Sequence, residues 1–116
     1  MTDEKSLLGV IGLCRGAGKA VVGVPMICEA LRRRDKKLLS KEISGDNDVD
    51  IIVIEASDTS ENTHKKITDK CAYYKVKCVR INSTCEALGR AVGKSAVAAV
   101  AIADKSFCRA VIAKLS

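Results

Sequence analysis

Ile51-Ile52-Val53-Ile54-Glu55-Ala56 is the stretch that decides the fold of this chain. Five of its six residues are apolar and four are β-branched, so it predicts a strand that is covered on both faces. A strand of this kind lies within a sheet, between two layers of helices. The stretch therefore indicates an α/β domain.

Two further runs predict strands. Residues 97–102 form a continuous apolar run of small and β-branched residues, typical of a strand covered on both faces, as in a parallel sheet. Residues 76–81 contain Lys77 and Arg80 and are more polar, which predicts a strand nearer an edge. The sheet therefore has at least three predicted members.

Helical patterns separate these runs. Pro25 suits a first helical position, and apolar residues follow it at helical spacing. Residues 58–61 offer several N-caps for a helix whose apolar face runs to Tyr74. Residues 6–15 are ambiguous, because glycines interrupt an otherwise helical apolar pattern.

The last third of the chain carries the clearest helix signals. Ser83 and Glu86 have the spacing of a capping box, and Gly93 marks the stop of the helix that follows. Asp104 can cap a final helix. The alternation of helices and strands predicts one three-layer α/β/α sandwich over residues 1–116, with a mixed central sheet and an exposed loop insertion at 38–50.

Composition narrows the class of function. Aromatic residues make up 3% of the chain, so it has no platform for stacking single-stranded bases. Residues 1–58 hold nine basic and ten acidic side chains, whereas residues 59–116 hold eleven and four, for a net charge of +6. A basic half favours a polyanionic partner, above all a nucleic acid.

Targeting and metal signals are weak. The N-terminus does not read as a secretory leader, and no run approaches the ~20 apolar residues of a membrane span, so we expect a cytoplasmic protein with reduced thiols and no membrane partner. The six cysteines form no Cys-x-x-Cys pair, and the chain has one histidine. We therefore expect no metal and no cofactor.

The glycine-rich stretch from Leu13 to Gly23 resembles a phosphate-binding loop but fails its rules. A Walker A loop needs a hydroxyl after the lysine, and Lys19 is followed by Ala20. A dinucleotide fingerprint would need glycine at Val21. A nucleotide enzyme is thus disfavoured, which leaves a basic turn that faces RNA phosphate or a tight loop whose glycines serve the backbone.

Three stretches together resemble a known family. They are residues 15–23 with Arg15-Gly16-Ala17-Gly18-Lys19, residues 56–71 with Ser60-Glu61-Asn62-Thr63, and residues 88–94 with Leu88-Gly89-Arg90-Ala91-Val92-Gly93-Lys94. The chain resembles the ribosomal L7Ae/L30e family of kink-turn RNA-binding proteins, and looks closest to its small bacterial members. The likeness covers essentially the whole chain.

The resemblance implies an RNA-binding site. In the family, a glycine-led start of the second helix enters the RNA groove and reads sheared G·A pairs, and a loop packs on the flipped nucleotide. Those positions are residues 23–26 and 94–96 here. The family pattern Gly-x-Asn-Glu-x-x-Lys becomes Pro25, Met26 and Glu29 at its last three defined positions, and each lost base contact is worth about 1–3 kcal/mol.

These observations together predict a non-catalytic protein, not an enzyme, that either associates with ribosomes or binds structured RNA, with ribosomal or kink-turn RNA as its partner and no DNA partner. A protein–protein interaction module on the same fold, with RNA readout lost, is the alternative. The residues predicted to bind RNA are Lys19, Gly23, Val24, Pro25, Met26, Arg32, Arg33, Lys94 and Ser95.

Overall fold

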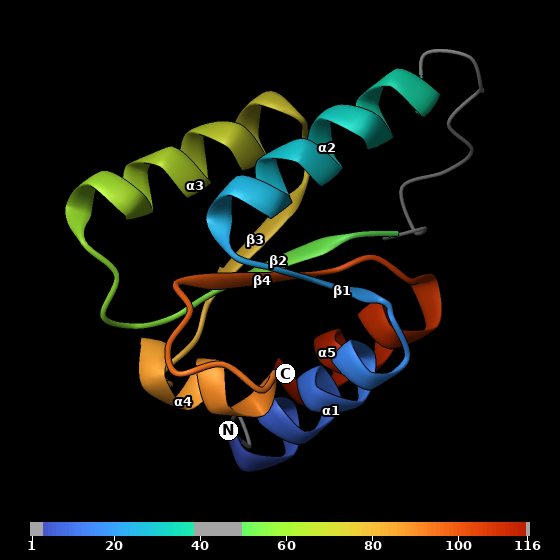
Figure 1. The fold of residues 1–116 in the computed structure, drawn as a ribbon. Helices are drawn as coiled ribbons and strands as arrows, with labels where there is room; N and C mark the ends of the chain where they lie inside the picture. The colour runs from blue at the N-terminus through green and yellow to red at the C-terminus, as the bar shows by residue number, and fades with distance from the viewer. Residues whose placement is uncertain (1–3, 39–49, 116) are drawn as a thin grey trace.

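The computed structural model describes residues 4–38 and 50–115 (Figure 1). The predicted insertion at 38–50 lies almost wholly outside the described residues. Helices and strands follow one another in the order α1 (Glu4–Gly16), β1 (Ala20–Val22), α2 (Val24–Leu38), β2 (Ile52–Glu55), α3 (Glu61–Tyr73), β3 (Lys77–Arg80), α4 (Cys85–Ala91), β4 (Ala99–Ile102) and α5 (Lys105–Leu115). The predicted α/β class is confirmed.

The four strands form one mixed sheet in the order β1-β4-β2-β3. β2 runs parallel to β3, and β4 runs antiparallel to both β1 and β2, with Val53 opposite Ala101. The mixed sheet and the edge position of β3 are as predicted. The parallel setting inferred for residues 97–102 is wrong, because an unbroken apolar run shows that a strand is covered on both faces but not which way it points.

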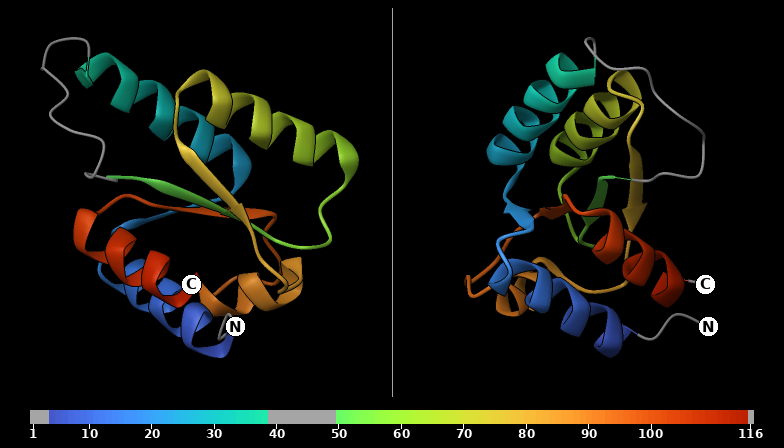
Figure 2. Two further views of the ribbon diagram at one scale, coloured as in Figure 1. Left: turned by 180° about the vertical axis from the view of Figure 1, so that it is seen from behind. Right: turned by 90° about the vertical axis from the view of Figure 1, so that its right-hand side faces the viewer.

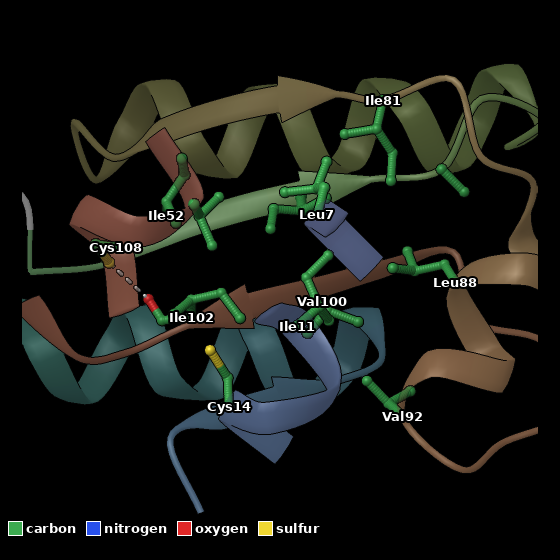
Figure 3. Close-up of a cluster of buried hydrophobic side chains, with 13 residues drawn as sticks. Leu7, Ile11, Cys14, Ile52, Ile81, Leu88, Val92, Val100, Ile102 and Cys108 are labelled. Carbon is green, nitrogen blue, oxygen red and sulfur yellow. Dashed lines mark hydrogen bonds between the residues drawn. The ribbon is translucent and has the colours of Figure 1, made fainter. Parts of the chain in front are cut away.

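Helices cover both faces of the sheet, which confirms the three-layer sandwich (Figure 2). Residues of α1, α4 and α5 pack on one face with Ile52 and Ile54, in the cluster shown in Figure 3. Residues of α2 and α3 pack on the other face with Val53 and Ala101. Both faces of β2 are fully buried, as its sequence predicts. No helix among the described residues is long and apolar enough to cross a bilayer.

The ambiguous residues 6–15 are helical, within α1. Gly12 serves the packing of this helix, because a Cβ built on it would lie 2.9 Å from the carbonyl oxygen of Ala91. The backbones of α1 and α4 therefore approach closely at this point. β1 was not predicted, since its three residues follow a glycine-rich turn and are too few to show a period.

The structure confirms the N-caps predicted for α3 and α5 but not the one predicted for α4. The Ser60 hydroxyl accepts from the backbone N–H of Thr63, and Asp104 accepts from that of Phe107 at 3.1 Å. The capping box at Ser83 is wrong, because Thr84 is the N-cap of α4 and accepts from the backbone N–H of Ala87. Ser83 is held elsewhere: its hydroxyl donates to Glu4 at 3.4 Å, and its carbonyl accepts from the backbone N–H of Ser57.

All six cysteines are free thiols, and Cys14, Cys71 and Cys108 are buried in the core. Burial raises the pKa of the Cys14 thiol to about 11, and the nearby Cys108 adds to the shift. The thiolate form is therefore disfavoured in the folded protein.

Raising the pH from 9 to 11 is expected to destabilise the protein partly through Cys14. Because its pKa is higher when folded than when unfolded, its contribution is complete below the unfolded pKa and is lost as pH rises through the folded value. Denaturant unfolding at several pH values measures this. In Cys14→Ala, the fall in unfolding free energy should be shallower, by up to about 1.4 kcal/mol per pH unit. An equal slope in both proteins would contradict the assignment.

Candidate functional site

Three connecting segments meet at one edge of the sheet, where β1, β2 and β3 end and β4 begins. The backbone N–H of Gly23 donates to Ala99 at 3.1 Å, and that of Ala56 donates to Ala98 at 2.9 Å. We call this the loop edge; it comprises the start of α2 (residues 23–26), the β2–α3 segment (56–60) and the α4–β4 loop (93–98). It lies at the left of Figure 1.

The start of α2 presents both apolar side chains and free backbone donors. Gly23 has φ +92°, a conformation that favours glycine and turns the chain from β1 into the helix. Val24 packs against the core, whereas Pro25 and Met26 are exposed, Met26 by 60%. The first intrahelical bond runs from the Ile27 N–H to the Gly23 carbonyl, so the earlier N–H groups of the first turn have no intrahelical acceptor.

The α4–β4 loop folds back on the helix before it. The backbone N–H of Lys94 donates to the Gly89 carbonyl at 2.8 Å, and that of Val97 donates to the Cys85 carbonyl at 3.0 Å. Between these anchors, Lys94 and Ser95 are exposed. The loop is therefore fixed to α4 at both ends and displays one cation and one hydroxyl.

Six of the predicted residues thus share the loop edge: Gly23, Val24, Pro25, Met26, Lys94 and Ser95. Lys19 lies elsewhere. Its carbonyl accepts from the backbone N–H of Ala103 at 2.8 Å, which places it at the opposite end of β1, about 13 Å from Gly23 at strand spacing. The glycine-rich turn that carries Lys19 joins α1 to β1 and does not lead directly into a helix.

Arg32 and Arg33 are exposed about 12 Å along α2 from its start, by helical rise. Both donate to the carboxylate of Glu29, Arg32 at 2.8 and 2.9 Å and Arg33 at 3.1 Å. These bonds, that from Arg32 first, hold the pKa of Glu29 below its usual range. The ion pairs offset part of the positive charge that the two arginines would offer to RNA.

A polar cluster at the loop edge was missed from sequence. The side chain of Glu55 is 1% exposed and accepts from the Thr59 hydroxyl, and His64 Nδ1 lies 2.8 Å from both carboxylate oxygens. From sequence, His64 is predicted to be a surface residue with no acid beside it; its side chain is 42% exposed, but Glu55 is its acidic partner, so the second part of that prediction is wrong. The available signal was an acid within an apolar strand, because a buried carboxylate needs partners.

Asp58 ties the β2–α3 segment of the loop edge to α4. Its carboxylate accepts from the backbone N–H of Cys85 at 2.7 Å, at the start of α4. The interaction with Cys85 lowers the pKa of Asp58. Within residues 4–38 and 50–115 no three His, Cys, Asp or Glu side chains gather as metal ligands. The chemistry that this edge offers is hydrogen bonding and positive charge.

Known proteins share the sequence pattern of this chain. The model of the Ribosomal protein L7Ae/L30e/S12e/Gadd45 family matches residues 5–112. An RNA-binding protein YlxQ of Bacillus subtilis is 35% identical over 106 residues, which cover 91% of each chain. Another RNA-binding protein YlxQ, of Enterococcus faecium, is 32% identical over 92 residues, 79% of this chain and 75% of that protein.

Solved structures share the fold. A Bacillus halodurans protein, described as having unknown function, aligns with a TM-score of 0.74 at 26% identity, over 94% of this chain and 95% of its own. A 15.5-kDa RNA-binding protein of Giardia lamblia aligns with a TM-score of 0.67 at 18% identity, over 99% and 88% of the two chains. The match over nearly the full length of the chain places it in the Ribosomal protein L7Ae/L30e/S12e/Gadd45 family.

Proposed function

We propose that the protein is a cytoplasmic, non-catalytic RNA-binding protein that recognises structured RNA, ribosomal RNA included, through the loop edge. The observation that carries the proposal is the meeting of the α2 start with the α4–β4 loop, the two segments for which the family resemblance implies RNA contact. Its membership of the family and its likeness to two proteins named as RNA-binding support it.

The chemistry of the loop edge suits RNA shape and backbone. Free N–H groups in the first turn of α2 can meet phosphate oxygens, aided by the positive end of the helix dipole. Lys94 adds a cation and Ser95 a hydroxyl from the opposite segment. Contacts of this kind position an RNA without reading its sequence.

The residues at the start of α2 are poorly suited to recognise RNA bases by hydrogen bonding. Pro25 and Met26 have no side-chain donor or acceptor that could bond a base edge in the way Asn and Glu do. Exposed Met26 offers an apolar contact to a base instead. We therefore propose that the protein still prefers a kinked RNA over a plain duplex, but by shape and with a modest ratio of affinities.

Filter binding tests this with a kink-turn RNA and a duplex of matched length, each at two salt concentrations. We expect tighter binding to the kink-turn RNA, and weaker binding of both RNAs at higher salt because phosphate contacts release counterions. Equal binding of the two RNAs would contradict the proposed preference for kinked RNA. No binding at low salt would contradict RNA binding itself and would favour the alternative of a protein–protein interaction module.

Association with the ribosome is tested separately. We expect the native protein to co-sediment with ribosomal particles and to leave them when salt is raised, since the contacts proposed above are largely to phosphate. Crosslinking in cells, followed by sequencing of the attached RNA, would identify the RNA. Recovery of protein partners without RNA would contradict the proposal.

A further inference from the structure

Glu55 is the one charged residue buried among the described residues. Its strongest contacts are with His64 Nδ1, 2.8 Å from both oxygens, and with the Thr59 hydroxyl. Arg80 Nε lies further away, 3.8 Å from Oε2. A separation of 3.8 Å is too long for a hydrogen bond. The nearby arginine therefore lends charge to Glu55 but is oriented mainly by other groups.

Backbone carbonyls hold the guanidinium of Arg80. Nε donates to Ala56 at 3.4 Å, and Nη2 donates to Ser57 at 2.9 Å and to the Thr59 hydroxyl at 3.4 Å. Arginine has five N–H donors, and these contacts occupy the three on Nε and Nη2. The two on Nη1 have no protein acceptor within residues 4–38 and 50–115, and the side chain is 43% exposed. The plane of the Arg80 guanidinium is therefore fixed, and its two Nη1 N–H groups remain available to an acceptor.

Arg80 lies on the same edge of the sheet as the proposed RNA contacts. It pairs with Glu55, Glu55 pairs with Ala99, and Ala99 accepts from Gly23. Three strand spacings separate Arg80 from Gly23, about 15 Å. A single nucleic-acid-binding module buries about 600–1,000 Å² of protein surface, which corresponds to a patch about 30 Å across. Both residues therefore fit within one footprint of that size.

We propose that Arg80 is an RNA-phosphate contact of the loop edge, held in place by the carbonyls of Ala56 and Ser57 and by the buried carboxylate of Glu55. The two N–H groups on Nη1 can donate to phosphate oxygens, and a guanidinium that is already oriented loses little freedom on binding. This inference rests on the proposed function. The competing interpretation is that Arg80 only balances the charge of Glu55.

The first test compares Arg80→Gln with Lys77→Gln by filter binding to the kink-turn RNA and the matched duplex. Lys77 is exposed on the same strand, so its replacement removes the same charge away from the loop edge. We expect Arg80→Gln to lower the affinity for both RNAs about tenfold. It should also lower the slope of log affinity against log salt by about 1. Lys77→Gln should change neither quantity appreciably. Thermal unfolding confirms that each variant is folded.

The double variant Glu55→Gln/Arg80→Gln separates the two interpretations. It removes one charge of each sign, so the net charge of the cluster is unchanged and no buried carboxylate is left without its cation. If Arg80 contacts phosphate, the affinity and the salt slope stay as low as in Arg80→Gln. If Arg80 only balances Glu55, the double variant regains wild-type affinity, and the inference is overturned.

Other outcomes are equally decisive. If wild-type protein binds RNA and Arg80→Gln matches Lys77→Gln, the phosphate contact is refuted while the proposed function stands. If wild-type protein binds neither RNA, the proposed function fails and the inference fails with it. Arg80→Lys should recover part of the affinity, because lysine keeps the charge but cannot reproduce the planar donor pair.

Discussion

Replacement of Pro25, Met26 and Glu29 by Asn, Glu and Lys is expected to raise affinity for a kink-turn RNA by at least about 30-fold relative to a matched duplex. The change restores the family pattern at the start of α2, where residues 25 and 26 are exposed. Two side chains that bond base edges return, and each such contact is worth about 1–3 kcal/mol. Pro25 lies in the first turn, where its missing N–H is not needed, so Asn fits the same backbone.

Charge alone does not produce this result. Glu29→Lys by itself removes the acceptor of Arg32 and Arg33, so it makes α2 more basic. That single variant should strengthen binding to both RNAs alike and should steepen the salt dependence. Filter binding of the single and triple variants at two salt concentrations measures the difference. Equal ratios of kink-turn to duplex affinity in the two variants would show that α2 does not read bases in this protein.

Gly89→Ala is expected to destabilise the protein and to weaken RNA binding together. A Cβ at this position would lie 2.6 Å from the Cα and 2.7 Å from the backbone nitrogen of Ala96, so the α4–β4 loop must move. Because the contact is with backbone, no side chain can rotate away. Overpacking of this kind costs about 1–3 kcal/mol or more. Denaturant unfolding and filter binding at a temperature where the variant is folded measure the two effects.

Gly9→Ala is the matched control. Gly9 lies on the exposed side of α1, where an added Cβ would have nothing within 4 Å, and alanine is the better helix former. This variant should be more stable by roughly 0.5–1 kcal/mol and should bind RNA as the wild type does. If Gly89→Ala behaved like Gly9→Ala, the close approach of α4 and its loop would not constrain the site.

Strong local patterns predicted the fold well. The apolar run around Val53 predicted a strand covered on both faces. Asp104 predicted the start of α5, and residues 58–61 offered several N-caps for α3, of which Ser60 is the one used. The direction of β4 and the existence of the three-residue strand β1 could not be predicted from the sequence. Direction depends on how the connections pack, and β1 is too short to show a period.

The candidate site was predictable only where it is contiguous. Residues 23–26 and 94–95 came from motifs, and the structure brings them to one edge. Glu55 and Arg80 lie on two different strands and His64 lies on a helix. Because these residues are far apart in sequence, no contiguous motif contains the cluster. Lys19 lies close to Gly23 in sequence, but an intervening strand separates the two residues in space.

The two anchors of the α4–β4 loop have a consequence for the thermodynamics of binding. Fixing the backbone of one residue costs about 1–2 kcal/mol in conformational entropy. Since the N–H groups of Lys94 and Val97 are already bonded to α4, the backbone of the loop loses this entropy when the protein folds and not when RNA binds. RNA that meets Lys94 and Ser95 therefore has only their side chains to order, and more of each contact's free energy remains as affinity.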